Sequence, residues 1–218
     1  MDKAASTLEK HLILGRNADW IQEQNVVIRS RNFAHLLDSS FQLQEITLGP
    51  GAQLELASAF SCIEVFLPLV GEIQLDSGLC LEVGEFWTEF VPKEKRTSLH
   101  NPFPTESIHV LRISLASDKG IHPDYHTLSE SELNEKIHQI WESPDKMYRI
   151  NLGKISGRSD VNFEPSSSSF ALALTGVFEY QKCLLEQGDG LAIKGVEEIE
   201  LECLTPEGLI LILEIGRE

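Results

Sequence analysis

The sequence predicts an all-β fold in which two β-barrels follow one another along the chain, joined by a segment with a short α-helix. Short runs of alternating apolar and polar residues fill most of the chain, turn residues separate these runs, and a glycine pattern of the first half recurs in the second. We expect a first barrel over residues 1–125, a linker with the helix over 126–145 and a smaller second barrel over 146–218.

The first half of the chain reads as a series of short, half-buried strands. In "AQLELA", the apolar residues Ala52, Leu54 and Leu56 fall on one face and Gln53 and Glu55 on the other, which is the two-residue period of a strand. Turns are predicted at residues 49–51, 76–78 and 101–102. Strands this closely spaced favour an antiparallel sandwich or barrel over a parallel sheet with crossover helices.

The hydrophobic period changes between the two halves. Apolar residues of "SESELNEKIHQIWES" recur at helical spacing, at Leu133, Ile137, Ile140 and Trp141. Ser129 and Glu132 have the spacing of a capping box, and Pro144 marks a stop. A helix over residues 129–143 is therefore predicted.

Strand-like runs resume after this segment and repeat the order of the first half. "PLVGEIQLDSGLCLEVGEF" carries Gly71 and Gly84, 13 residues apart, and "ALTGVFEYQKCLLEQGDGL" carries Gly176 and Gly188, 12 residues apart. The similar order of strands, turns and glycines predicts two related barrels in tandem.

Composition narrows the classes of partner. The 34 acidic and 18 basic residues give a formal charge of −16, which disfavours direct contact with nucleic acid or an anionic membrane. The N-terminus lacks the apolar core of a signal peptide, and no apolar run reaches the length of a membrane-spanning helix. We therefore expect a cytoplasmic protein whose four cysteines, each alone in an apolar run, are reduced.

Two stretches of the first half resemble the motifs of the cupin superfamily. Gly51, Glu64 and Gly71 have the spacing of the motif G-x5-H-x-H-x3,4-E-x6-G, and its two histidine positions fall on Ala57 and Ala59. The second motif, G-x5-P-x-G-x2-H-x3-N, fits more loosely. Gly84 and Pro92 are separated by seven residues instead of five, Glu94 stands at the glycine position, Thr97 at the histidine position and Asn101 at the asparagine position.

Within this superfamily the chain most resembles the pirin family of two-barrel cupins. The resemblance rests on the order of "LVGEIQLDSG", "GEFW" and "HPDYHTL" and on the shorter second half. It implies two barrels and, in pirins, a nonhaem iron or similar ion held by three histidines and a glutamate. Some pirins are transcriptional cofactors that act through protein contacts, and others are quercetin 2,3-dioxygenases. On the pirin alignment, His100 falls on the third histidine and Pro102 on the glutamate.

The residues at the expected metal positions cannot hold such an ion. The methyl groups of Ala57 and Ala59 carry no lone pair, and Thr97 replaces an imidazole, whereas Fe(II) and Zn(II) sites normally have three or four protein ligands. We therefore expect no cofactor. Iron or zinc would bind only through relocated ligands, drawn from Glu55, Glu64, His100 and His109.

Two residues are candidates for chemistry of another kind. Glu64 alternates with Ile63 and Val65, so it is expected to point into the first barrel, either as an acid/base group or as a hydrogen-bonded carboxylate without a catalytic role. His100 is either a general base or a loop histidine before Asn101.

Three functions remain open at this point. The first is a binding or regulatory protein without catalysis, with a small molecule in the first barrel or a protein partner. The second is a metal-free enzyme that uses Glu64 and His100. The third is a metal enzyme similar to quercetin 2,3-dioxygenase with relocated ligands. The missing histidines favour the first, without metal-dependent dioxygenase activity.

Overall fold

The structure, a computed structural model, is described for residues 9–37, 39–129, 133–165, 168–195 and 198–216. The chain divides into two compact units. The first unit comprises residues 18–128, and the second joins the segment up to Asn17 to the segment from Ser129 onward.

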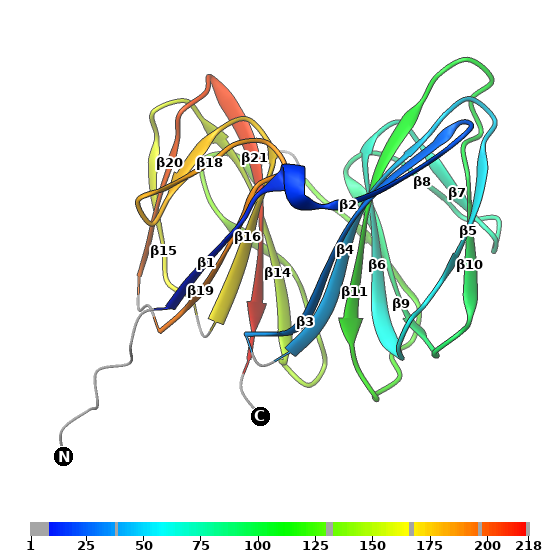
Figure 1. The fold of residues 1–218 in the computed structure, drawn as a ribbon, viewed down its shortest axis with the longest axis horizontal. Helices are drawn as coiled ribbons and strands as arrows, with labels where there is room; N and C mark the ends of the chain where they lie inside the picture. The colour runs from blue at the N-terminus through cyan, green and yellow to red at the C-terminus, as the bar shows by residue number, and fades with distance from the viewer. Residues whose placement is uncertain (1–8, 38, 130–132, 166–167, 196–197, 217–218) are drawn as a thin grey trace. The chain divides into compact units, whose positions relative to one another are not determined.

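The first unit consists of two antiparallel sheets (Figure 1). Its strands are β2 (Asp19–Glu23), β3 (Val26–Leu36), β4 (Ser39–Leu48), β5 (Gln53–Ala57), β6 (Cys62–Val70), β7 (Ile73–Leu75), β8 (Cys80–Leu81), β9 (Glu85–Val91), β10 (Arg96–His100), β11 (Ile108–Ala116) and β12 (Asp124–Thr127). The larger sheet has the order β12-β9-β6-β11-β4-β3-β2, and the smaller has the order β5-β10-β7-β8.

Apolar side chains from both sheets of the first unit pack into one core. Each alternates along its strand with residues of the opposite face, as the two-residue period of a strand requires. The buried members of this core are Ile28, Ile46, Leu48, Leu56, Phe66, Ile73, Leu75, Leu81, Leu99, Ile108 and Val110. Their strands therefore fix which other side chains of the first unit point between the sheets.

A buried asparagine holds the loops at one end of the first unit. The Nδ2 amide of Asn101 donates to the backbone oxygens of Leu48, Gly49 and Glu106, at 3.0, 2.8 and 2.8 Å. Its Oδ1 accepts a hydrogen bond of 2.9 Å from the Phe103 amide. Because Asn101 is fully buried, its side-chain amide depends on these backbone groups for its hydrogen bonds.

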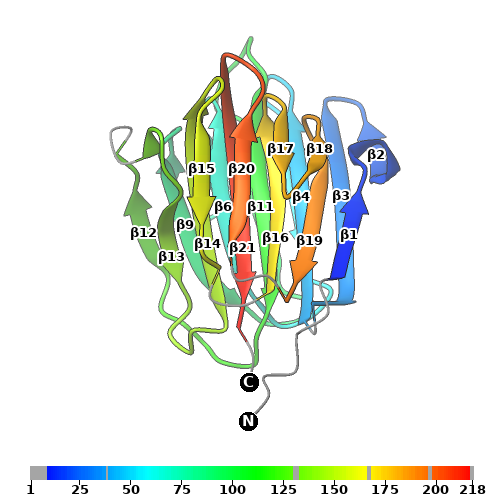
Figure 2. The ribbon, with the colours of Figure 1, turned by 90° about the vertical axis from the view of Figure 1, so that its left-hand side faces the viewer.

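The second unit is also built from two antiparallel sheets, and the strands of both are labelled in Figure 2. Its elements are β1 (Glu9–Ile13), the 3-10 turn η1 (Gly15–Asn17), β13 (His138–Glu142), β14 (Tyr148–Ser156), β15 (Asp160–Phe163), β16 (Ser168–Thr175), β17 (Phe178–Tyr180), β18 (Cys183–Leu185), β19 (Gly190–Lys194), β20 (Ile199–Cys203) and β21 (Glu207–Ile215). The sheet orders are β1-β19-β16-β21-β14-β13 and β15-β20-β17-β18.

The second unit encloses a core of apolar side chains. It is filled by side chains that include Phe178, Tyr180, Leu191 and Ile210. Tyr180 is fully buried, and its hydroxyl lies 3.3 Å from the Ser169 hydroxyl. Burial raises the pKa of Tyr180 far above its ordinary value, so this hydroxyl stays neutral.

The N-terminal segment differs from the predicted boundary, which assigned residues 1–125 to the first barrel. Strand β1 pairs with β19, from Glu9 opposite Lys194 to Ile13 opposite Gly190. The Gly15 amide also donates to Asp189 Oδ1 at 2.6 Å. A partner this distant in sequence leaves no mark on the local pattern, so the boundary could not be predicted from it.

The predicted helix over residues 129–143 is wrong in its second half, where β13 forms instead. Residues 130–132 lie outside the described residues. β13 pairs with β14, and its register shifts between Gln139 and Trp141. The extra residue at this bulge changes the spacing of the apolar side chains, so that a strand imitates helical periodicity. The predicted linker over 126–145 is therefore part of both units, through the end of β12 and through β13.

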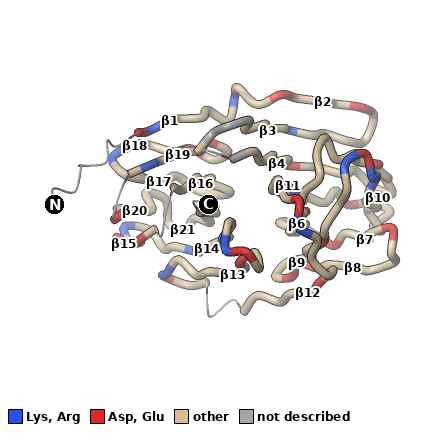
Figure 3. The backbone as a smooth tube through the Cα atoms, turned by 90° about the horizontal axis from the view of Figure 1, so that it is seen from below, with Lys and Arg blue, Asp and Glu red and all other residues tan. Residues whose placement is uncertain are grey.

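Within the described part of the chain, no helix combines the length and the apolar content needed to cross a bilayer. Acidic positions are distributed over the strands and loops of both units, and basic positions lie among them (Figure 3).

Candidate functional site

The inner face of the first unit carries a buried ion pair. Phe66 on β6 and Val110 on β11 belong to the apolar core. Glu64 is two positions from Phe66 on β6, and Arg112 is two positions from Val110 on β11. Because alternate residues of a strand share a face, Glu64 and Arg112 also point between the sheets. Their exposed fractions are 0% and 1%, respectively.

A network of hydrogen bonds surrounds the Arg112 guanidinium. Its Nη2 contacts Glu64 Oε1 and donates to Ser58 Oγ at 3.0 Å, while Nη1 donates to Gln44 Oε1 at 2.7 Å. The Ser58 hydroxyl donates to Glu64 Oε1. Gln44 Nε2 then donates to Ser30 Oγ at 3.0 Å. We call these five residues the Arg112 network, and within it the charge of Glu64 is balanced by the protein itself.

Some buried polar atoms in this region have no hydrogen-bond partner among the described residues. They are Glu64 Oε2, Arg112 Nε, Ser114 Oγ and Thr97 Oγ1. Ser114 lies directly opposite Glu64 in the β11–β6 ladder, and Thr97 shares the inward face of β10 with Leu99. Unpaired buried donors and acceptors of this kind are the atoms to which a small polar molecule would bind.

Cys62 lies at the edge of the Arg112 network but is not a reactive thiol. Its Sγ is 3.8 Å from Glu64 Oε1. Burial and, after it, the charge of Glu64 raise the pKa of Cys62 to about 11. Because the thiolate is the nucleophilic form, Cys62 is chemically inert at neutral pH.

The two alanines at the predicted metal positions do not face the core. Leu56 points inward, and so does Ser58 two positions later, whereas Ala57 and Ala59 are exposed. The inward position in this segment is therefore occupied by a serine. The motif spacing alone predicted that residues 57 and 59 point inward. This prediction is wrong by one residue, which exchanges the two faces of the strand.

The structure does not bring His100 together with Glu64. On β10, Leu99 is buried in the core, so the adjacent His100 lies on the outer face. Its Nδ1 lies 3.2 Å from Gln74 Oε1, in a surface hollow that also includes Asp76. The predicted acid/base pair of Glu64 and His100 is therefore not assembled.

The other residues proposed as relocated metal ligands are also dispersed. Glu55 is exposed and pairs with Arg96 at 2.7 Å. His109 lies on the opposite face of β11 from Arg112. Among the described residues, no group of three or more His, Cys, Asp and Glu side chains comes close enough to hold a metal ion.

His109 should make the protein less stable in mild acid. Burial lowers the pKa of His109 below its ordinary value near 6.5, Glu45 partly opposes this and Arg29 adds to it. Between the lowered folded-state pKa and about 6.5, the unfolded chain binds more protons than the folded chain, so stability falls as the pH falls through this window. Replacing His109 with Gln should reduce the loss of unfolding free energy between pH 7 and 5, measured by urea titration. His122→Gln, an exposed histidine, is the control and should leave the pH dependence unchanged.

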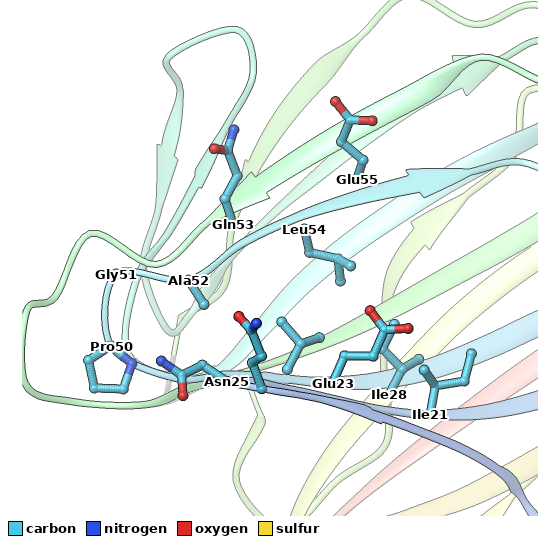
Figure 4. Close-up of a pocket in the computed structure, with 12 residues that line it drawn as sticks. Ile21, Glu23, Asn25, Ile28, Pro50, Gly51, Ala52, Gln53, Leu54 and Glu55 are labelled. Atoms are coloured by element: carbon cyan, nitrogen blue, oxygen red, sulfur yellow. The ribbon is translucent and has the colours of Figure 1, made fainter.

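A separate groove opens at the surface of the first unit, between β5 and the hairpin formed by β2 and β3 (Figure 4). Its volume is about 1030 Å³. Leu54 and Ala52 point toward the hairpin, while Gln53 and Glu55 point away from it (Figure 4). Glu64 and Arg112 do not line this groove, so the first unit has two distinct features, an internal ion pair and an external groove.

Comparison with known proteins identifies the fold. No known family profile matches the sequence, and no curated protein matches it. Among solved structures, the bacterial pirin YhhW of Escherichia coli in complex with nickel(II) matches with a TM-score of 0.76 and 15% identity over 96% of this chain and 100% of that chain. YhaK of Escherichia coli matches with a TM-score of 0.74 and 17% identity over 86% and 93% of the two chains.

The chain has the pirin-like cupin fold. A quercetin 2,3-dioxygenase from Acinetobacter baumannii shares this fold, with a TM-score of 0.69 and 12% identity over 93% of this chain and 84% of that chain. The all-β prediction and the predicted resemblance to pirins are confirmed at the level of fold.

Sequence reasoning missed Arg112, Ser58 and Gln44. A signal for Arg112 was present, since it alternates with Val110 and Ser114 in the otherwise apolar run "HVLRISL". A charged residue in the middle of such a run needs a buried partner of opposite charge, and Glu64 was the candidate.

Proposed function

We propose that this protein is a pirin-like protein without a catalytic metal, which acts by binding a small molecule or a protein partner. The observation that carries the proposal is the contact of Arg112 with Glu64. A guanidinium remains charged at any physiological pH, so it is a permanent cation beside the inward carboxylate.

The donor atoms around Glu64 do not fit a transition metal. The side chains within the Arg112 network offer two hydroxyls, one amide and one carboxylate, and that carboxylate is already paired. Iron, nickel and zinc in proteins favour imidazole nitrogen or thiolate sulfur together with carboxylate. A divalent ion at Glu64 would also be repelled by the adjacent guanidinium.

The metal-free enzyme has weaker support. It requires Glu64 to exchange protons with a second group, and His100 lies on the outer face of β10. The quercetin dioxygenase alternative requires several relocated ligands, and Glu55, His100 and His109 lie apart from Glu64. A binding role needs neither condition.

The proposal is tested by metal content. The purified protein is dialysed against Ni²⁺, Fe²⁺ or Zn²⁺ and desalted. The metal bound per chain is then measured by inductively coupled plasma mass spectrometry. We expect far less than one equivalent of each metal per chain. The double substitution Ser58→His and Arg112→His, which adds two imidazoles beside Glu64, should increase the retained metal.

The matched control is Glu55→Gln, which removes an exposed carboxylate and should leave the metal content unchanged. One equivalent of metal in the unmodified protein, lost in Glu64→Gln but kept in Glu55→Gln, would contradict the proposal.

A further inference from the structure

Strand β5 ends the smaller sheet of the first unit, and its one neighbour in that sheet is β10. The Asn101 amide donates to the Ala52 oxygen at 2.9 Å, and the Ser58 amide donates to the Lys95 oxygen at 3.2 Å. In an antiparallel ladder, every second residue bonds to the same neighbour. The even-numbered residues from Ala52 to Ser58 therefore face β10.

The odd-numbered residues of β5 consequently turn their backbone groups to the open edge. These residues are Gln53, Glu55 and Ala57. Their N–H and C=O groups form a row to which a further extended chain can bond. This is the arrangement by which many domains bind a peptide as an added strand.

The groove beside this edge has an apolar floor and an acidic rim. Ile21, Ile28 and Leu54 contribute to the floor, and Glu23 and Glu55 contribute carboxylates (Figure 4). The residues that line the groove include no lysine or arginine. Glu55 is paired with Arg96, but both side chains are exposed by more than half, and pairs of this kind are weak enough to exchange.

The side chains of β5 define what an added strand must carry. A residue opposite Leu54 would point with it toward the floor, and a residue opposite Glu55 would point with it to the outer side. The position opposite Leu54 therefore favours an apolar side chain, and the position opposite Glu55 favours a basic one. The formal charge of −16 favours a basic partner as well.

We propose that the groove binds an extended segment of a partner protein in which apolar and basic residues alternate, and that this segment adds to the edge of β5. The proposal rests on the binding role proposed above and specifies the class of partner. It assigns the role to the outer edge of the first unit, apart from Glu64 and Arg112.

Two labelled synthetic peptides of equal length test it, one alternating valine with lysine and one alternating valine with glutamate. Binding is measured by fluorescence anisotropy with the full chain at physiological salt. The lysine peptide should bind at least about tenfold more tightly than the glutamate peptide. The carboxylates of Glu23 and Glu55 attract its lysine side chains and repel the glutamate side chains of the other peptide.

Two substitutions at one position separate charge from backbone bonding. Glu55→Gln removes the carboxylate but keeps the edge N–H, and we expect it to weaken lysine-peptide binding about threefold. Glu55→Pro removes the N–H as well and should weaken binding about fivefold further. Glu82→Gln is the charge control, since Glu82 follows β8 at the other end of this sheet, and it should bind as the unmodified protein does. Circular dichroism checks that each variant is folded.

A charge exchange gives a second, independent measurement. Glu23→Lys combined with Glu55→Lys should reverse the preference, so that the glutamate peptide binds more tightly. Equal binding of the lysine peptide by Glu55→Pro and Glu55→Gln, an unreversed preference, or no binding at all would overturn the proposal. So would a dimer of the unmodified chain that Glu55→Pro converts to a monomer, because the occupant would then be a second copy.

The two proposals fail separately. Absence of peptide binding by a metal-free protein overturns the edge proposal alone. One equivalent of bound metal that is lost in Glu64→Gln but kept in Glu55→Gln overturns the proposed function, whether or not the peptides bind.

Discussion

Replacing Arg112 with Met should lower the free energy of unfolding by about 3–5 kcal/mol, which is the usual cost of removing one partner of a buried ion pair. Glu64 has no exposed surface, and the guanidinium is the group that balances its charge. Without it, a buried carboxylate must remain charged without a counterion or take up a proton. Chemical denaturation at pH 7, followed by circular dichroism, measures the change.

The double variant Glu64→Leu with Arg112→Met separates the ion pair from simple packing. It removes both charges and keeps apolar volume, so it should be markedly more stable than Arg112→Met alone. Arg96→Met, which breaks the exposed pair with Glu55, should cost less than about 1 kcal/mol. If Arg112→Met were as mild as Arg96→Met, the Arg112 network would not bear on the stability of the first unit.

Replacing Asn101 with Asp should destabilise the first unit by about 3 kcal/mol or more. The shape of the side chain is kept, but a carboxylate oxygen then replaces the Nδ2 donor and faces the oxygens of Leu48, Gly49 and Glu106. Leu48 and Gly49 are buried, and each buried carbonyl that loses its donor costs about 1–3 kcal/mol. The new charge is desolvated as well. Thermal and urea unfolding both report the loss.

Asn101→Ala should cost less than Asn101→Asp, because it removes the donor without adding a charge. Asn32→Asp is the matched control, since Asn32 is exposed and already accepts a hydrogen bond from Gln42 through Oδ1. Equal stability of Asn101→Asp and Asn32→Asp would mean that the loops after β4 and β10 do not depend on this amide.

The sequence was sufficient to predict the all-β fold because alternation is a local property. "AQLELA" and "CIEVF" each show which side chains share a face, and Glu64 is indeed buried with Phe66. The spacing from Gly51 to Gly71 was also sufficient to indicate the cupin resemblance. These signals lie within a single strand or between adjacent strands.

Features that depend on pairing between distant segments could not be predicted in the same way. The inward position of Ser58 depends on the register between β5 and β10, and a shift of one residue exchanges it with Ala57. His100 was expected near the site because the pirin alignment placed it there, but its strand turns it outward. The run around Arg112 indicates that it needs a buried partner, but Glu64 is 48 positions away and the contact between them depends on the pairing of β6 with β11.

The pairing of β1 with β19 has a consequence for how the chain is made. Strand β1 leaves the ribosome long before its partner strand β19, which begins only at Gly190. The first unit is continuous in sequence and can fold before β19, the partner of β1, has been synthesised. Closing so long a loop makes the larger sheet of the second unit a late step of folding. A tag fused ahead of β1 is therefore expected to disturb the second unit, which is completed after the first, although the first unit is nearer to the tag in sequence.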